Sequence, residues 1–438
     1  MSTKSYFRTL LVAIALLTGT VANTMAQTGT LATMTTTESS VKITAYWTGD
    51  GSILANGMPI ISGFDVDIAP DSDGLLTLTA SGTVSLTGLW CIDNSLTSLD
   101  VSGCTELHML HVSHNSLTTL DVSNCTKLGV LHCDNNSLTS LDVSGCTELM
   151  QLFCHNNSLT TLDVSNCTKL VVMYCSHNSL TSLDVSGCTE FTQLFCHNNS
   201  LTSLDVSGCT ELYMLYVSHN SLTTLDVSKF TKLNTLACHN NSLTSLDVSG
   251  LTELTYLFCG NNSLTTLNLS GCTELNSLNA ENQAISVTKS GGNYTNPVTY
   301  TLPDGSLQSI NVGNSTYAYD SPLEGPTSGN TLMFATAYTT SDENSQPFSG
   351  ILTLEGYTFT DIEQVGTAVF SAYPNPTDGM VTVTGLTPGA TISIYSAFGA
   401  LVATHTAYGE EATIDLSSLA SGTYILNVNE KTLKVIRK

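Results

Sequence analysis

The stretch LTSLDVSGCTELHMLHVSHNS, residues 96–116, decides the fold because it returns with little change every 21 residues. Ten such units run from Leu75 to Ala284. A period of this length indicates a solenoid, in which each unit stacks on the next. We number the positions of a unit from Leu96, position 1, to Ser116, position 21. Ten stacked units predict a coil ~50 Å long in which equivalent residues form columns.

Within each unit lies the pattern L-x-x-L-x-C-x-x-N-x-L, as at Leu149, Leu152, Cys154, Asn157 and Leu159. This pattern resembles the leucine-rich repeat family, and the short, cysteine-rich units are most similar to the J-type internalins, which are bacterial surface proteins. The resemblance implies a mainly β fold, a right-handed solenoid with short parallel strands. Because 21 residues leave no room for a convex helix, the alternating LTSLDVS segment predicts a second short extended stretch.

All 14 cysteines lie at positions 9 and 17 of the repeat. In the nine units from Leu96 onward, position 9 is instead occupied by Phe230 and Leu251 in two, and position 17 by Val112, Val217 and Ala280 in three. These substitutes can fill a core but cannot bind a metal or form a disulfide, so we expect buried free thiols. Disulfides and a metal site are the alternatives, because rungs ~4.8 Å apart lie within the Cα separation that a disulfide spans.

Three polar columns have structural interpretations. Asparagine at position 20 can bond the loops of its own and the next rung. Aspartate at position 5 recurs in eight units and is expected to accept bonds from its turn, with a cation-binding rail as the alternative. Glutamate and lysine share position 11, so neighbouring rungs should form exposed ion pairs.

Positions 14, 16 and 18 are expected to project from the concave ribbon, and position 16 holds six aromatic residues in ten units. Exposed aromatic patches mark binding sites, although stacking that only stabilises the ribbon is the alternative. Zinc binding by His111, His132, Asp134 and His155 is a weaker alternative to solvated histidines, and we predict neither a metal nor a cofactor. The candidate binding residues are Trp90, Phe153, Tyr174, Phe195, Tyr216 and Phe258, with His155 and His197.

The segments on either side of the repeats differ in composition. Residues 1–26 carry basic residues, the apolar run LLVAIALL and a small-residue site, which predicts a signal peptide cut after Ala26; no segment is long enough to span a membrane. Residues 27–74 are expected to form an N-terminal β cap, and residues 285–365 a β-rich cap or spacer domain. Four aspartates in the cap suggest either an acidic turn or a calcium loop: Asp65, Asp67, Asp71 and Asp73.

Residues 366–438 contain short alternating strands that predict a β-sandwich. The segment resembles the type A C-terminal sorting domain of the type IX secretion system of Bacteroidetes. This resemblance implies export through the type IX machinery, followed by release or attachment at the outer-membrane surface. It rests on Tyr373, Pro374, Asn375, Pro376, Gly422, Thr423 and Tyr424, with the basic tail Lys434, Arg437 and Lys438.

The formal charge of −24 makes nucleic acid and anionic membranes poor partners, and the chain lacks the usual catalytic motifs. We therefore predict a non-enzymatic, adhesin-like protein, secreted or held at the cell surface. Its partner would be a host or microbial surface protein or glycoprotein, bound at the concave face. A glycan-capturing protein of polysaccharide uptake and a structural surface-layer protein are the alternatives.

Overall fold

The structure, a computed structural model, describes residues 27–288, 294–312, 315–318, 321–323, 331–336, 347–355, 371–396, 400–428 and 431–438. Strands form all of the regular secondary structure in these ranges, which confirms the predicted mainly β fold. Over the same ranges, no helix has the length and apolar character needed to cross a membrane. The predicted signal peptide lies outside the described residues. The chain forms two compact units, one ending near residue 355 and the other containing the C-terminal domain.

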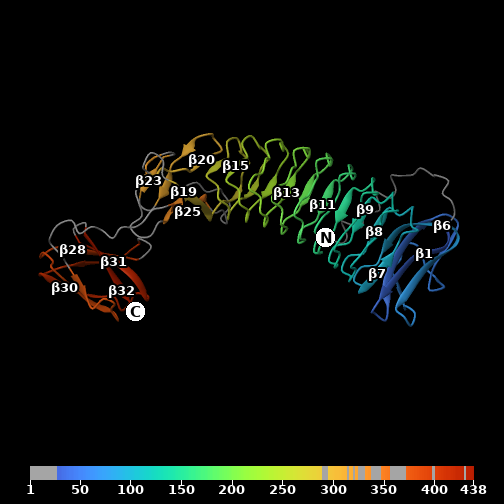
Figure 1. Ribbon diagram of the computed structural model, residues 1–438, viewed down its shortest axis with the longest axis horizontal. Helices are drawn as coiled ribbons and strands as arrows, with labels where there is room; N and C mark the ends of the chain where they lie inside the picture. The colour runs from blue at the N-terminus through green and yellow to red at the C-terminus, as the bar shows by residue number, and fades with distance from the viewer. Residues whose placement is uncertain are drawn as a thin grey trace. The chain divides into compact units, whose positions relative to one another are not determined.

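A parallel ribbon of ten strands runs through the repeats, one strand from each unit (Figure 1). Neighbouring strands pair in register, so that Phe153 lies beside Tyr174 and Leu152 beside Met173. The middle residue of each three-residue strand is buried, and in most strands the two outer residues are partly exposed. The strands are β6 (Leu75–Trp90), β8 (Met109–His111), β9 (Val130–His132), β10 (Gln151–Phe153), β11 (Val172–Tyr174), β12 (Gln193–Phe195), β13 (Met214–Tyr216), β14 (Thr235–Ala237), β16 (Tyr256–Phe258) and β18 (Ser277–Asn279).

The core of the coil consists of the leucine, valine and cysteine columns. Leu152, Cys154, Leu159 and Val164 are all fully buried, and equivalent residues are buried in the neighbouring rungs. All fourteen cysteines are free and buried, as the substitution pattern predicted. The thiols at position 9 also donate to a carbonyl of the preceding rung, as in the 3.5 Å contact between Cys167 Sγ and the Val143 oxygen.

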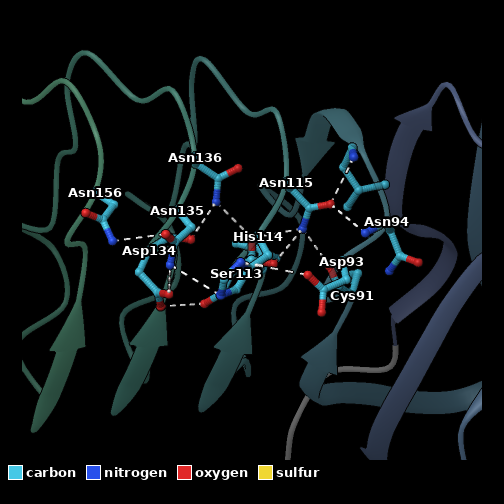
Figure 2. Close-up of polar contacts among 12 residues, drawn as sticks. Cys91, Asp93, Asn94, Ser113, His114, Asn115, Asp134, Asn135, Asn136 and Asn156 are labelled. Carbon is cyan, nitrogen blue, oxygen red and sulfur yellow. Dashed lines mark hydrogen bonds and ion pairs between the residues drawn. The ribbon is translucent and has the colours of Figure 1, made fainter.

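The asparagine column joins successive rungs, as predicted. Asn157 Nδ2 donates to the carbonyl oxygens of Cys133 at 3.0 Å and Cys154 at 3.1 Å. Its Oδ1 accepts a bond from the backbone N–H of Leu138 at 2.9 Å. One amide thus satisfies three backbone groups from two rungs, and Figure 2 shows the same arrangement at Asn115.

The aspartate column forms turns on the opposite side of the coil. Asp163 Oδ1 accepts a 2.9 Å bond from the backbone N–H of Ser165, and equivalent bonds recur along the column. Parallel bridges join successive aspartates from Asp100 to Asp205, and strands β15 (Ser245–Asp247) and β17 (Thr266–Asn268) continue this second ribbon. These bonds support the turn interpretation over a cation-binding rail.

Ion pairs at position 11 also follow the prediction. Lys127 Nζ lies 2.6 Å from Glu106 Oε2, and Lys169 Nζ lies 2.6 Å from Glu148 Oε2. Lys232, the next lysine of the column, forms a third ion pair with Glu211 of the preceding rung. All three link adjacent rungs at a partly or fully exposed edge, where each contributes little to stability.

The N-terminal segment forms an antiparallel cap that merges with the coil. Strand β6 begins at the boundary predicted at Leu75, but its first part pairs with the cap strands, and only Gly88–Trp90 pair in parallel with β8. In the acidic loop, Asp71 Oδ1 accepts backbone bonds from Asp73 and Leu75, as in an ordinary turn. The remaining strands here are β1 (Gln27–Thr36), β2 (Val41–Thr48), β3 (Gly51–Ala55), β4 (Met58–Pro59), β5 (Val66–Ile68) and β7 (Leu96–Asp100).

Beyond the last repeat, the chain adds strands to the same compact unit. Strand β20 (Thr299–Thr301) continues the second ribbon by pairing with β17, and β21 (Leu307–Gln308) pairs with β20. A separate sheet has the order β19-β25-β24-β22-β23. Its strands are β19 (Gln283–Val287), β22 (Ile310–Val312), β23 (Ser315–Tyr317), β24 (Thr331–Ala335) and β25 (Ser349–Leu354).

The C-terminal unit has two antiparallel sheets around its own core, in which Val381, Ile392 and Leu426 are fully buried. One sheet has the order β26-β27-β30, and the other β29-β28-β31-β32. The strands are β26 (Ser371–Tyr373), β27 (Met380–Thr384), β28 (Thr391–Ser396), β29 (Leu401–Thr406), β30 (Glu411–Asp415), β31 (Gly422–Val428) and β32 (Lys431–Arg437).

Candidate binding face

Position 16, which we call the ring column, carries a continuous stack of side chains. Phe153 and Tyr174 have ring centroids 4.6 Å apart and planes inclined by 10°. The next two pairs are equally close to parallel, at 4.1 Å and 11° between Tyr174 and Phe195, and at 4.5 Å and 14° between Phe195 and Tyr216. His132 extends the stack by one ring, 4.2 Å from Phe153.

The structure brings together four of the six aromatic residues predicted for this face. Trp90 instead packs against Tyr46 of the cap, with centroids 4.5 Å apart. Phe258 is separated from Tyr216 by the rung that carries Ala237. The candidate aromatic residues therefore form one stack of four, with two members outside it.

The stacked rings are partly buried, which corrects the expectation that each is exposed. The cause is the register of the parallel ribbon, which places each ring against the face of the next. The ring faces are therefore covered by neighbouring rings, and the edges remain available to solvent. Burial also raises the pKa of the Tyr174 and Tyr216 hydroxyls.

The face around the stack carries no fixed charge over six rungs. From residue 149 to residue 263, positions 12–21 contain no Asp, Glu, Lys or Arg, although the whole chain has 36 acidic residues. Amide, hydroxyl and apolar side chains flank the rings instead, and the Tyr174 hydroxyl donates to Gln193 Oε1 at 3.5 Å. Histidine is consequently the only side chain of this face whose charge changes near neutral pH.

Five histidines line one edge of this face on consecutive rungs. They alternate between positions 18 and 19, and we call them the histidine row: His155, His177, His197, His219 and His239. The rings of His177 and His197 have centroids 5.4 Å apart, and those of His219 and His239 are 5.3 Å apart.

Sequence reasoning identified His155 and His197 but missed His177 and His219, because it considered only the alternate positions that point out of a strand. Position 19 has a left-handed backbone, with φ near 54° at His177, and its side chain returns to the same edge. The alternation of CHNNS with CSHNS or VSHNS along the chain was the signal that could have revealed the row.

One carboxylate stands near the start of the row. Asp134 is buried and accepts bonds from Ser113 Oγ at 2.5 Å and Asn135 Nδ2 at 2.8 Å (Figure 2). Its Oδ2 also lies 3.6 Å from His155 Nε2. No group of three or more metal-ligating side chains is suitably placed in the part of the chain that the structure describes, so nothing here supports the zinc alternative.

Comparisons with known proteins agree with this architecture. Residues 134–149, 197–210 and 260–277 match the family described as leucine-rich repeat. The repeats are leucine-rich repeats. Residues 371–438 match the family described as secretion system C-terminal sorting domain, which directs the chain to the cell surface or the exterior by the type IX route. No curated protein sequence matches the chain.

Three solved structures illustrate the similarity of the repeats. The functional domain of InlJ from Listeria monocytogenes, described as including a cysteine ladder, has 26% identity and a TM-score of 0.38, over 62% of this chain and 81% of that one. A leucine-rich repeat protein of Leptospira interrogans has 23% identity and a TM-score of 0.41, over 45% and 56%. YopM from Yersinia enterocolitica has 26% identity and a TM-score of 0.37, over 45% and 43%.

The sorting motif residues lie near the last strand of their unit. Asn375 Nδ2 donates to the Lys434 carbonyl at 2.6 Å, and its Oδ1 accepts from the Ile436 N–H at 2.8 Å. The Tyr424 hydroxyl donates to the Ala420 carbonyl at 2.8 Å. Tyr373, Pro374 and Pro376 are exposed, and Gly422 and Thr423 begin strand β31.

Proposed function

We propose that the concave face of the leucine-rich repeats binds a protein or glycoprotein of a host or microbial surface, in the manner of an adhesin and without catalysis. The observation that carries this proposal is the ring column, Phe153 to Tyr216, set in a face without fixed charge. Aromatic side chains at protein interfaces supply rigid contact area with little loss of conformational entropy. Desolvating this face on binding leaves no carboxylate or ammonium group unpaired.

The stacking geometry favours a protein partner over the glycan-capturing alternative. Sugar rings pack against the face of an aromatic ring, but the inner ring faces of this column are already covered by their neighbours. Ring edges carry a positive partial charge, and they suit backbone carbonyl oxygens and apolar side chains. The glycan part of a glycoprotein would then contribute less than its polypeptide.

The test compares proteins captured by immobilised full-length mature chain, residues 27–438, and by two variants. Tyr174→Ala and Phe195→Ala introduce the residue that Ala237 already supplies in the same column. Central aromatic anchors typically contribute ~2 kcal/mol or more to binding, so each variant should weaken binding of the captured partner at least tenfold. Thr161→Ala, an exposed change outside the concave face, is the matched control and should bind normally.

Full affinity in both ring variants would contradict the proposal and make the ring column purely structural. Carbohydrate-array binding that disappears in the same variants would favour glycan capture instead. Self-association with no captured partner would favour a surface-layer role. Thermal unfolding of each variant must be measured in parallel, because removing a ring could also destabilise the coil. The measurement separates a loss of stability from a loss of binding.

A further inference from the structure

We propose that the histidine row is an acid-dependent binding site for an acidic peptide segment, whose carboxylates pair with the imidazolium groups of His155, His177, His197, His219 and His239. This site adjoins the ring column, but it does not require the ring column to bind anything. Three features of the row support this site: the spacing of the imidazoles, the charges that surround them and the direction in which a ligand would change their protonation.

The spacing of the row suits an extended chain. Five consecutive rungs cover ~19 Å, which about six residues of an extended peptide also span. The pairs at 5.4 Å and 5.3 Å are close enough for one carboxylate to contact two imidazoles. In His155, His197 and His239, Nδ1 is buried without a hydrogen-bond partner, so Nε2 is the ring nitrogen that a ligand can contact. In His177 and His219, Nε2 instead lies 3.3 Å and 3.2 Å from the side-chain amide nitrogens of Asn198 and Asn240.

The charges that act on the row leave its central part without a counter-ion. Asp134 acts on His155, at the start of the row. His197 is affected by four other histidines, and His239 by His219. The rings packed against the row belong to Tyr174, Phe195 and Tyr216, none of which is charged near neutral pH. Protonation of the central histidines therefore creates positive charge that an external anion can neutralise.

The same surroundings favour the neutral form of three of the five imidazoles, those of His155, His197 and His239. Burial, followed by repulsion from the other histidines, lowers the pKa of His197 to about 4. Burial also lowers the pKa of His155 and His239. A bound carboxylate acts in the opposite direction and favours the imidazolium form. Binding must consequently take up protons, and affinity must rise as the pH falls.

The experiment uses the full-length mature chain and a hexa-aspartate peptide, with isothermal titration calorimetry at pH 5 and pH 7.5 in buffers of different ionisation enthalpy. With one proton taken up per peptide, affinity changes by roughly tenfold per pH unit in the coupled range. We expect at least a tenfold tighter association at pH 5 and uptake of one proton or more. Equal affinity at the two pH values, or no proton uptake, would overturn the proposal.

The variant for this site comes from the repeat itself. His177→Asn and His219→Asn introduce the residue found at position 19 in neighbouring rungs, and His197→Ser introduces the residue found at position 18. The triple variant should fold normally and lose the acid-dependent binding. The control is His108→Thr, at position 13 and outside the histidine row, where other rungs already carry threonine. This variant should retain the acid-dependent binding. Unchanged binding by the triple variant would refute the assignment.

Two further arms identify the ligand and separate this proposal from the previous one. Acid-dependent binding of a sulfated oligosaccharide, without binding of hexa-aspartate, would overturn the assignment to an acidic peptide. Phe195→Ala should retain binding of hexa-aspartate, because the ring contributes no charge. Loss of the captured partner together with retained peptide binding in that variant would support both proposals independently.

Discussion

The leucine-rich repeats and the sorting domain use asparagine in the same way but in different numbers. Asn157 bonds the backbone of two rungs, and equivalent asparagines do so along the whole coil. Asn375 bonds two backbone groups of the last strand, the Lys434 carbonyl and the Ile436 N–H, and this arrangement occurs once. Damage to one rung of a repeat array remains largely local, because each rung contacts only its neighbours. The sorting motif occurs once, so no equivalent residues elsewhere in the chain can preserve its function when it is damaged.

The largest expected effect follows removal of the sorting domain. A chain ending at residue 370 should accumulate in the periplasm with its repeats still folded, because the repeats belong to a separate compact unit. Cell fractionation and thermal unfolding of the purified protein provide the two measurements. Normal display of the truncated chain at the cell surface would contradict the assignment.

Within the coil, the largest effect is expected from Asn178→Ala. The change removes bonds to the Leu159 N–H and to the Cys154 and Cys175 carbonyl oxygens. An unsatisfied buried group costs about 1–3 kcal/mol, so the three together should cost at least ~3 kcal/mol in a chemical denaturation experiment. Asn166→Ala, at an exposed asparagine, is the control and should change stability by less than about 0.5 kcal/mol.

His132 offers a test of pH dependence at one buried position of the ring column. Burial lowers its pKa to about 3, below the ordinary value of 6.5, so the unfolded chain takes up the proton first as pH falls. The contribution of His132 to the free energy of unfolding is therefore complete above pH 6.5, and it decreases as the pH falls from 6.5 toward the folded-state pKa. At pH 5 the loss is about 2 kcal/mol, and His132→Phe, which imitates Phe153, should remove that part of the pH dependence of the melting temperature.

The cysteine columns should show a smaller effect. Cys154→Ala leaves a cavity and is expected to cost ~1–2 kcal/mol, whereas Cys154→Val should cost less because Val217 occupies the same column. Thiol titration should find nearly 14 reactive groups in the denatured, unreduced protein and few in the native one. Mass mapping that assigns most cysteines to disulfides would disprove the free-thiol interpretation.

The smallest effect is expected at the exposed ion pairs. Lys169→Ala removes the contact with Glu148, and both side chains are about half exposed. Such pairs contribute about 0–1 kcal/mol and are weakened by salt. Chemical denaturation should therefore show a loss of less than about 1 kcal/mol at low ionic strength and a smaller loss at high ionic strength. A loss above 2 kcal/mol would show that this edge contributes more than its geometry indicates.

The sequence was most informative where a residue type recurs. The buried leucine and cysteine columns, the asparagine bonds and the aspartate turns follow from the 21-residue period, because ten copies reveal which positions tolerate only small or apolar residues. Features outside the period were not predictable in the same way. Strand β6 combines a cap strand with the strand of the first rung. Only its long-range pairing with β1 and β3 shows where the cap part ends and the first rung begins.

The candidate site shows the same division. The period placed Phe153 and Tyr216 on one face, but ring-to-ring geometry and the left-handed backbone at His177 depend on three-dimensional stacking. The rule that successive side chains point to opposite faces holds only while the backbone stays extended. It therefore gives the wrong face for residues just beyond the strand, such as His177. The uncharged character of the face was visible in the sequence once the rungs were aligned.

The free thiols also impose a kinetic requirement on export. In the folded coil, burial raises the pKa of Cys91 to about 12 and that of Cys125 to about 11, which suppresses the reactive thiolate. Before folding, fourteen cysteines cross the bacterial periplasm, where oxidation favours disulfides. The coil must therefore fold faster than its thiols oxidise, or be kept reduced until it does. Contacts between residues only 21 to 24 positions apart favour rapid folding, so the short repeat protects its own cysteines.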